Sequence, residues 1–382
     1  MLGMLGMSLY ILADTYFIFK SSRFKWYHAL NLVLPLYNLI FAIGAMIGVG
    51  SAIRFVIERG KKNPDADGYF FHALICAFFI SLIFVFIGIF LPDKLVALLG
   101  GDAEIIQTGT SYTRIFMCFS PFFMWNHICN AFVRNDKNPS IAMAATLFSS
   151  LFNIVFDYIF NVSSRSCYER GSSCYRFFLR LSEFLICCIH FFSRKSTIKL
   201  IPVLPSIKKL IYSCQVGVSA FVGEISSGVI TVTFNMIILN LAGNTGVAAY
   251  GVVANTSLVA VALFNGIAQG SQPLISRSYG RGEEQNVRSL LKMALTTALG
   301  LGFLLMIFIF FSAPAVTAVF NSEHDLQLAA YADSGLRLYF IGFLFAGINI
   351  VGTAALSAVE SVKYAFCASI SRGFVATIFF AF

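Results

Sequence analysis

Residues 246–276 read GVAAYGVVANTSLVAVALFNGIAQGSQPLIS, and the residues that follow, 277–288, read RSYGRGEEQNVR. The first stretch carries no charged side chain. As an α-helix, which rises about 1.5 Å per residue, it is long enough to cross a hydrocarbon layer about 30 Å thick. The second stretch carries three arginines, Arg277, Arg281 and Arg288. A long apolar stretch that ends in a basic turn is typical of a membrane-spanning helix.

The same pattern recurs along the whole chain of 382 residues. Hydrophobic residues make up 58% of the sequence and charged residues only 12%, whereas soluble proteins carry about 25% charged residues. We therefore predict an all-α polytopic membrane protein. Its apolar stretches lie at about 1–20, 29–56, 69–91, 105–133, 140–162, 181–192, 209–241, 246–276, 289–312, 326–357 and 363–382. The stretch 181–192 is too short to span a membrane alone.

The turns between these stretches alternate in charge. Segments 58–67, 134–140, 193–209 and 277–288 are basic, whereas 92–104, 241–246 and 321–325 are neutral or acidic. Because positive charge marks the cytoplasmic side, we expect a multi-pass protein of the plasma membrane with a cytoplasmic N-terminus. These basic turns explain the net charge of +9 without a nucleic-acid partner.

Motifs of soluble enzymes are absent from the sequence. There is no phosphate-binding P-loop, no G-x-S-x-G nucleophile motif and no H-E-x-x-H zinc motif. The nine cysteines show no C-x-x-C pair, so neither a metal site nor a disulfide framework is expected. We predict a protein that is not an enzyme and that needs no cofactor.

An internal repeat indicates two halves. At an offset of 222 residues, Gly44, Gly48 and Gly60 align with Gly266, Gly270 and Gly282. At an offset of 223, Arg114, Phe122, Asn126 and Ala131 align with Arg337, Phe345, Asn349 and Ala354. Parallel repeats of this kind predict two six-helix bundles related by pseudo-two-fold symmetry, with a site between them. We expect an N-terminal bundle over 1–192, a cytoplasmic linker over 193–208 and a C-terminal bundle over 209–382.

Four polar residues inside the apolar stretches are candidates for a cation site. Asp14 lies in the first stretch, Asn153 and Asp157 lie four apart in the fifth, and Glu224 lies in the seventh. An ionisable group inside a membrane is costly, so each needs a reason. Binding of a proton or of Na⁺ is one reason, and a hydrogen bond between helices is the alternative.

Other features inside the stretches are expected to be structural. Arg114, Arg337 and Arg372 lie near the ends of stretches, where long cationic side chains reach out to the membrane surface. Pro35, Pro121 and Pro273 lie within stretches and predict kinks.

Several segments resemble one family of transporters. SLYILADTYFI, ALNLVLPLY, AFVRNDKNPSIAMAATLFSSLFNIVFDYIF and the segment from GVAAYG (246–251) to KMAL (292–295) resemble the multidrug and toxic compound extrusion (MATE) family. The resemblance implies twelve helices in two bundles, of which this chain holds about 11 and lacks the last. It also implies export of amphipathic, often cationic compounds in exchange for H⁺ or Na⁺, by alternating access.

The resemblance also implies roles for the polar residues. The family's cation site uses an Asp on helix one, an Asn and an Asp four apart on helix five, and a Thr on helix six. Asp14, Asn153 and Asp157 match the first three, which makes Na⁺ possible there, and Glu224 matches an acidic position on helix seven.

Two short segments depart from the family and from the charge pattern. SSRFKWYH (21–28) and SSRSCYERGSSCYRFFLR (163–180) put positive charge on the side expected to face outward. Read one base later, back-translations of SSRFKWYH and of YERGSSCYRF (168–177) give AAGLNGIT and MKGAALATG, which fit the family. We infer two local frame slips, around 21–28 and 162–182, which leave Tyr175 where the family has its threonine.

These considerations predict a monomeric exporter of small-molecule drugs or toxic organic cations, embedded in a lipid bilayer. A lipid or lipid-linked oligosaccharide flippase of the same superfamily is an alternative, which a cavity lined by cationic groups able to hold phosphate would favour. A non-functional membrane remnant is another, and a membrane enzyme is the least expected.

Overall fold

The computed structural model describes residues 3–4, 6, 24–99, 103–136, 138–158, 183–191, 193, 196–199, 201–321, 325–375 and 379. All regular secondary structure within these ranges is helical. The residues of the two inferred frame slips lie outside this set, apart from the backbone of the first turn and a half of the helix that begins at Phe24.

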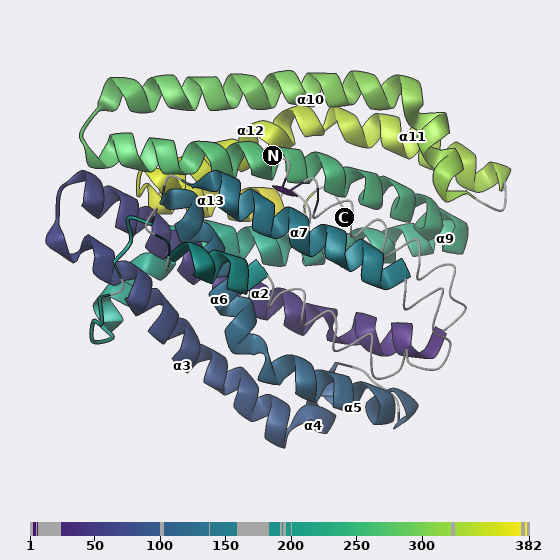
Figure 1. Ribbon diagram of the computed structural model, residues 1–382. Helices are drawn as coiled ribbons and strands as arrows, with labels where there is room; N and C mark the ends of the chain where they lie inside the picture. Colours follow the sequence, from purple (N-terminus) through teal and green to yellow (C-terminus); the bar gives the residue numbers. More distant parts are fainter. Residues whose placement is uncertain are drawn as a thin grey trace.

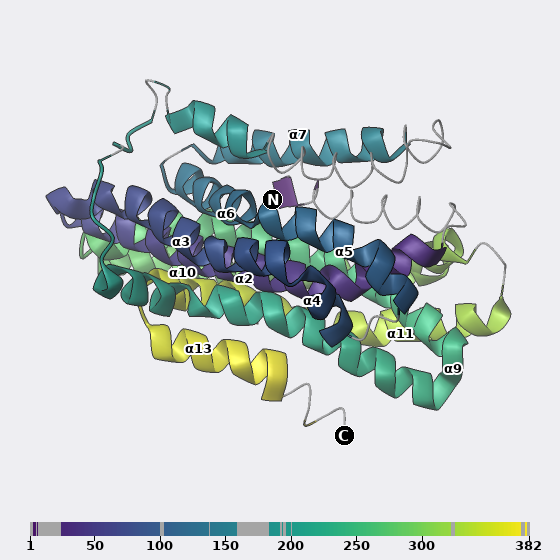
Figure 2. The same cartoon turned by 90° about the horizontal axis from the view of Figure 1, so that it is seen from below.

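The described helices form two groups (Figures 1 and 2). The first, here called the N-lobe, contains α2 (Phe24–Gly60), η1 (Pro64–Asp67), α3 (Gly68–Phe90), α4 (Pro92–Leu98), α5 (Ala103–Cys118), α6 (Ser120–Asn135), α7 (Pro139–Tyr158) and residues 183–199. The second, the C-lobe, contains α9 (Ile207–Gly280), α10 (Glu284–Phe320), α11 (Leu326–Ile341), α12 (Phe343–Ala358), α13 (Val362–Ile370) and the π-helical turn η3 (Ser371–Val375).

Each lobe has a hydrophobic core of its own. Phe55, Phe70 and Phe132 pack together in the N-lobe. The ring centroid of Phe132 lies 5.4 Å from that of Phe55 and 4.9 Å from that of Phe70. Phe264 and Phe340 pack around Phe343 in the C-lobe. Two separate cores are what two helical bundles require, because each bundle buries its own apolar faces.

Two of the predicted spans are broken helices. The stretches 105–133 and 326–357 were expected to be single spans, but each is a pair of helices, broken at Phe119 and at Gly342. The second pair is bent by 45°. Pro121, where a kink was predicted, lies in the first turn of α6 and cannot donate a hydrogen bond to the preceding turn, which fits the break at Phe119. The breaks are separated by the same offset of 223 residues as the sequence repeat, so the repeat extends to backbone geometry.

The seventh and eighth predicted spans belong to one element, α9, which reverses at Gly243. This glycine has φ 63° and ψ −158°, a conformation that side chains with a Cβ avoid. The rings of Phe234 and Tyr250, on either side of it, stack with centroids 5.6 Å apart. The connection predicted over 241–246 is therefore in the right place, and it is tighter than expected because the chain reverses at one glycine within it.

The outer surface of the lobes is apolar. Large hydrophobic side chains are exposed on α3 and α10, among them Phe79, Phe86, Phe303 and Phe311. Within the described residues, four helical stretches are long and apolar enough to cross a membrane, or up to five with the bent pair α11 and α12. Apolar side chains that cover a helical surface of this extent suit contact with lipid, so the predicted polytopic all-α fold is confirmed.

The lobes meet through α2 and α9, at the end of the molecule where the turns 58–67, 134–140 and 277–288 lie. We call this the basic end; its turns gather at the left of Figure 1. A Cβ on Gly50 would lie 1.9 Å from the carbonyl oxygen of Ser213, and one on Gly217 would lie 1.9 Å from that of Met46. Only glycine permits such an approach of two backbones, so the basic end is closed by direct helix contact.

An ion pair links the lobes at the same end. Arg54 of α2 pairs with Glu360, which follows α12, and with Glu58 at 2.9 Å. Its guanidinium also lies 4.4 Å from the ring centroid of Tyr212 on α9. These contacts hold the C-lobe against α2 where the glycines bring them together.

Candidate functional site

One face of α7 carries polar side chains into the N-lobe. Thr146, Ser150 and Asn153 recur at helical spacing, and the first two are buried. The buried Oδ1 of Asn153 has no hydrogen-bond donor within the described residues. Asp157 continues the same face one turn later, but its side chain lies outside the described part of the chain. The predicted pairing of Asn153 and Asp157 on one helix face is therefore matched by the backbone of α7.

A buried carboxylate lies against this face. Glu183, in the helix over 183–191, is 2% exposed and accepts hydrogen bonds from three neutral side chains. Asn126 and Asn130 of α6 donate through Nδ2 at 3.0 and 2.8 Å, and the hydroxyl of Thr146 donates at 3.0 Å. The Oδ1 of Asn126 is buried and has no donor within the described residues. Two helices, α6 and α7, thus converge on one buried carboxylate. We call Asn126, Asn130, Thr146 and Glu183, together with Asn153 on the same face of α7, the N-lobe polar cluster.

The beginning of the chain packs on α7. A Cβ on Gly3 would lie 3.4 Å from Cα of Met143, and one on Gly6 would lie 2.7 Å from Cδ2 of Leu147 and 3.5 Å from Oγ of Ser150. Residue numbers rise together along both segments, so they run in the same direction. Gly3 faces Met143 and Gly6 faces Leu147, which are offsets of 140 and 141 residues. A pairing of Asp14 with Asp157 requires the same direction and an offset of 143 residues. Asp14 itself lies outside the described residues.

The fourth predicted residue lies in the other lobe. Glu224 is on the first half of α9, where its side chain is exposed and makes no hydrogen bond or ion pair with any described residue. The adjacent Gly223 faces Arg372 of η3, whose Nη2 would lie 3.7 Å from an added Cβ. Arg372 therefore lies against α9. Glu224 therefore does not belong to the N-lobe polar cluster.

A second buried carboxylate fixes the segment after residue 183. Asp136, 1% exposed at the end of α6, accepts from Nε2 of His190 and from Oγ of Ser196, each at 3.0 Å, and also from the backbone N–H of Thr197 at 3.0 Å. Arg59 lies 3.6 Å away. These bonds hold both ends of residues 190–197 against α6 and so help to position Glu183.

The sequence analysis did not find Glu183, Asn126, Asn130 or Thr146 as site residues. Asn126 and Asn130 lie four apart in one apolar stretch, and Thr146 lies seven before Asn153, so helical spacing could have indicated them. Glu183 begins a stretch that was judged too short to span, and its partners come from two other helices.

The cluster is rich in oxygen and poor in fixed charge. Amide, hydroxyl and carboxylate oxygens are ligands for hard cations, and a buried carboxylate is also an acceptor for a proton. The unpaired Oδ1 atoms of Asn126 and Asn153 supply two further acceptors in the same lobe. The arrangement can thus hold H⁺ or a cation such as Na⁺.

Comparison with known proteins places the chain in a family. The family model named MatE matches residues 1–159 and 220–382, which is more than half of the chain. The chain belongs to the MatE family. The resemblance read from the sequence is thereby confirmed.

Relatives of this MatE-family chain extend over most of its length. The multidrug export protein MepA of Staphylococcus saprophyticus is 22% identical over 378 residues, 98% of this chain and 83% of that protein. MepA of Staphylococcus aureus strain MSSA476 is 22% identical over 357 residues, 91% of this chain and 78% of that protein.

Solved structures of MATE transporters have the same fold. A multidrug resistance MATE family transporter of the MOP superfamily in an outward-facing conformation is 20% identical, with a TM-score of 0.90 over 98% of this chain and 84% of the other. A MOP superfamily transporter from Pyrococcus furiosus, described as having a binding pocket of reverse polarity, is 21% identical, with a TM-score of 0.89 over 100% of this chain and 85% of the other. At these identities the likeness shows the fold of this MatE member and not its substrate.

Proposed function

We propose that this MatE-family chain is a secondary active multidrug exporter of the plasma membrane. It exchanges H⁺ or Na⁺ for amphipathic, often cationic compounds by alternating access between its two lobes. Membership of the family, and relatives whose names describe multidrug export, support the class of substrate. The basic end faces the cytoplasm in this proposal, because that is the side on which positive turns are retained.

The coupling ion binds in the N-lobe. The observation that carries this proposal is the polar face of α7, on which Thr146 donates to the buried Glu183 carboxylate and Asn153, two turns later, has a buried Oδ1 without a donor among the described residues. Asp14 and Asp157 complete the site, with Glu183 as the additional carboxylate. Glu224 acts separately, as an acidic group of the C-lobe.

Binding of the ion changes the charge of the site. A carboxylate without its ion is expensive in a membrane, and a bound proton or Na⁺ removes that cost. The ion therefore favours the conformation in which the carboxylates are enclosed, and its release favours the other. Exchange follows if the exported compound binds only when the ion has left.

Accumulation of ethidium in everted membrane vesicles tests this function. We expect accumulation that depends on an imposed H⁺ or Na⁺ gradient and that stops when an ionophore collapses the gradient. Asn153→Ala should lower the initial rate at least about tenfold, because a charged ligand site loses one oxygen. Asn286→Ala is the matched control, since this asparagine lies on the exposed start of α10 and bonds only to Glu283 at 2.9 Å.

A chain that reaches the membrane in normal amount but shows no gradient-dependent accumulation of ethidium or of other fluorescent cations would exclude the proposed exchange. If Asn153→Ala and Asn286→Ala lowered the rate of ethidium accumulation equally, the proposal that the coupling ion binds in the N-lobe would be wrong.

A further inference from the structure

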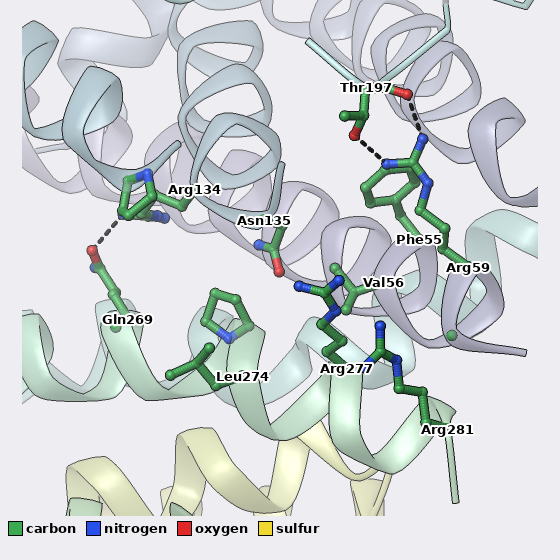
Figure 3. A pocket seen from close by; sticks show the side chains of 14 residues that line it. Phe55, Val56, Arg59, Arg134, Asn135, Thr197, Gln269, Leu274, Arg277 and Arg281 are labelled. Atoms are coloured by element: carbon green, nitrogen blue, oxygen red, sulfur yellow. Dashed lines mark hydrogen bonds between the residues drawn. The ribbon is translucent and has the colours of Figure 1, made fainter. Parts of the chain in front are cut away.

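A cavity of about 570 Å³ opens between the lobes at the basic end (Figure 3). Its walls come from the last turns of α2 and α6, the start of α7, Thr197 and the final turns of α9. Four arginines line it, Arg59 and Arg134 from the N-lobe and Arg277 and Arg281 from the C-lobe. No described residue of the lining is acidic. The lining is therefore positive on both sides of the interface.

Two of the arginines already have carboxylate partners. Arg59 lies 3.1 Å from Asp67 and 3.6 Å from Asp136, and Nη1 donates to the hydroxyl of Thr197 at 2.6 Å. Arg281 lies 3.8 Å from Glu283 at the exposed edge. Their charges are partly neutralised by the protein.

The other two arginines, Arg134 and Arg277, have no carboxylate within ion-pair distance among the described residues. Arg134 donates to the amide oxygen of Gln269 across the interface, and the Glu183 carboxylate attracts it from inside the N-lobe at more than ion-pair distance. Arg277 is half-buried, and no described hydrogen bond or ion pair involves its side chain. Figure 3 shows Arg277 directed toward Asn135, whose buried Oδ1 lacks a donor. Two guanidinium groups without an ion-pair partner among the described residues thus face the same cavity from opposite lobes.

This arrangement has an electrostatic cost that a bound anion would remove. Like charges repel, and the repulsion is greater where protein replaces water, so Arg134 and Arg277 oppose the contact of the lobes that α2 and α9 make. Guanidinium groups form paired, charge-assisted hydrogen bonds with phosphate oxygens. Phe55, Val56, Pro139, Pro273 and Leu274 give the rest of the cavity an apolar wall.

We propose that the cavity binds a phosphate group, shared between Arg134 of the N-lobe and Arg277 of the C-lobe. The apolar wall fits a phosphate that carries an organic substituent, and lipid headgroups and soluble phosphates share this chemistry. The bound phosphate links the two lobes and so favours the state in which the basic end is closed. Binding does not depend on the proposed exchange, because the cavity and its charges are present whether the protein exports drugs or, as the alternative that a cationic cavity favours, moves lipids.

The test uses the full-length protein with two kinds of probe. The first is titration of inorganic phosphate and pyrophosphate into protein in a neutral detergent, followed by calorimetry. The second is native mass spectrometry of protein from nanodiscs of phosphatidylglycerol or of phosphatidylcholine. We expect saturable binding of at least one probe, with phosphatidylglycerol retained in preference to phosphatidylcholine if the source is a lipid.

Arg134→Gln and Arg277→Gln should each weaken binding at least about tenfold, because each removes a charged hydrogen-bond donor. Arg288→Gln is the matched control, since this arginine is 83% exposed on α10 and lies outside the cavity. Arg277→Lys should retain part of the affinity. Calorimetric binding identifies a soluble phosphate as the ligand, and retention of phosphatidylglycerol alone identifies a lipid headgroup.

The proposal is overturned if the wild-type protein binds none of these probes in saturable fashion, a result that needs no variant to fold. It is also overturned if Arg288→Gln weakens binding as much as Arg277→Gln. A failure of ethidium transport with intact phosphate binding would exclude the exchange and leave this site in place.

Discussion

The two lobes share one backbone plan and differ in what their equivalent residues contact. Both contain a broken span, at Phe119 and at Gly342, and Asn126 and Asn130 of the first correspond to Asn349 and Thr353 of the second. In the N-lobe, both asparagines donate to the buried Glu183. In the C-lobe, Thr353 donates to Asn349 at 3.4 Å, within the same helix. The same positions therefore serve a buried carboxylate in one lobe and only local bonding in the other.

The glycines of the repeat differ in the same way. A Cβ on Gly48 would lie 3.1 Å from the carbonyl oxygen of His127 and from Cα of Ile128, so α2 packs closely on α6. A Cβ on the equivalent Gly270 would meet nothing within 4 Å. The N-lobe is tightly packed around its polar cluster, whereas the equivalent position of the C-lobe borders open space. The comparison teaches that the repeat preserves helix geometry while the contacts of equivalent residues differ between the lobes.

The largest expected effect comes from exchanging the two glycines for leucine. Gly48→Leu should lower stability by about 3 kcal/mol or more, because a side chain cannot fit between two packed backbones. Gly270→Leu should change the midpoint of thermal unfolding in detergent by a small fraction of that shift. Equal shifts for the two variants would show that the lobes are packed alike, contrary to this comparison.

A smaller effect is expected from the equivalent asparagines. Asn126→Ala removes one donor from the buried Glu183 carboxylate and should lower stability by about 1–3 kcal/mol. It should also reduce gradient-driven accumulation of ethidium about tenfold or more. Asn349→Ala removes only a weak bond within one helix. It should change stability by no more than about 0.5 kcal/mol and the rate of ethidium accumulation by no more than about twofold. Transport losses of equal size would indicate that both lobes hold a coupling site.

Much of the fold could be predicted from the sequence, because long apolar stretches bounded by basic turns have few alternatives in a membrane. The stretches 69–91 and 140–162 lie within one to four residues of α3 and α7 at each end. Pro121 marked the region of the break at Phe119, whereas no proline or polar segment marked the break at Gly342. The segment 241–246 indicated where the chain reverses, but the sequence did not show that Gly243 alone makes the reversal.

The placement of Asn153 and Asp157 on one helix face could be predicted, because their spacing is visible within one stretch, and their role in ion binding stays a prediction. Glu183 and its partners were missed because four residues from α6, α7 and the helix over 183–191 meet only in the folded lobe. The sequence analysis used the four arginines of the cavity only as parts of basic turns that indicate the orientation of the protein in the membrane. Nothing in the sequence shows that Arg134 and Arg277 line one cavity.

The central claim, that the N-lobe carries the coupling site, is tested most directly by one carboxylate from each lobe. Asp157 lies on the polar face of α7, and Asp333 of α11 accepts a hydrogen bond from Thr317 at 2.5 Å in the C-lobe. Initial rates of ethidium accumulation in everted vesicles, under an imposed H⁺ gradient and separately under an imposed Na⁺ gradient, are compared at equal amounts of protein in the membrane. Asp157→Asn should reduce the gradient-dependent rate to background, whereas Asp333→Asn should retain at least about half of it, because only the first removes a group that releases the coupling ion. Undiminished gradient-driven accumulation in Asp157→Asn would contradict the claim.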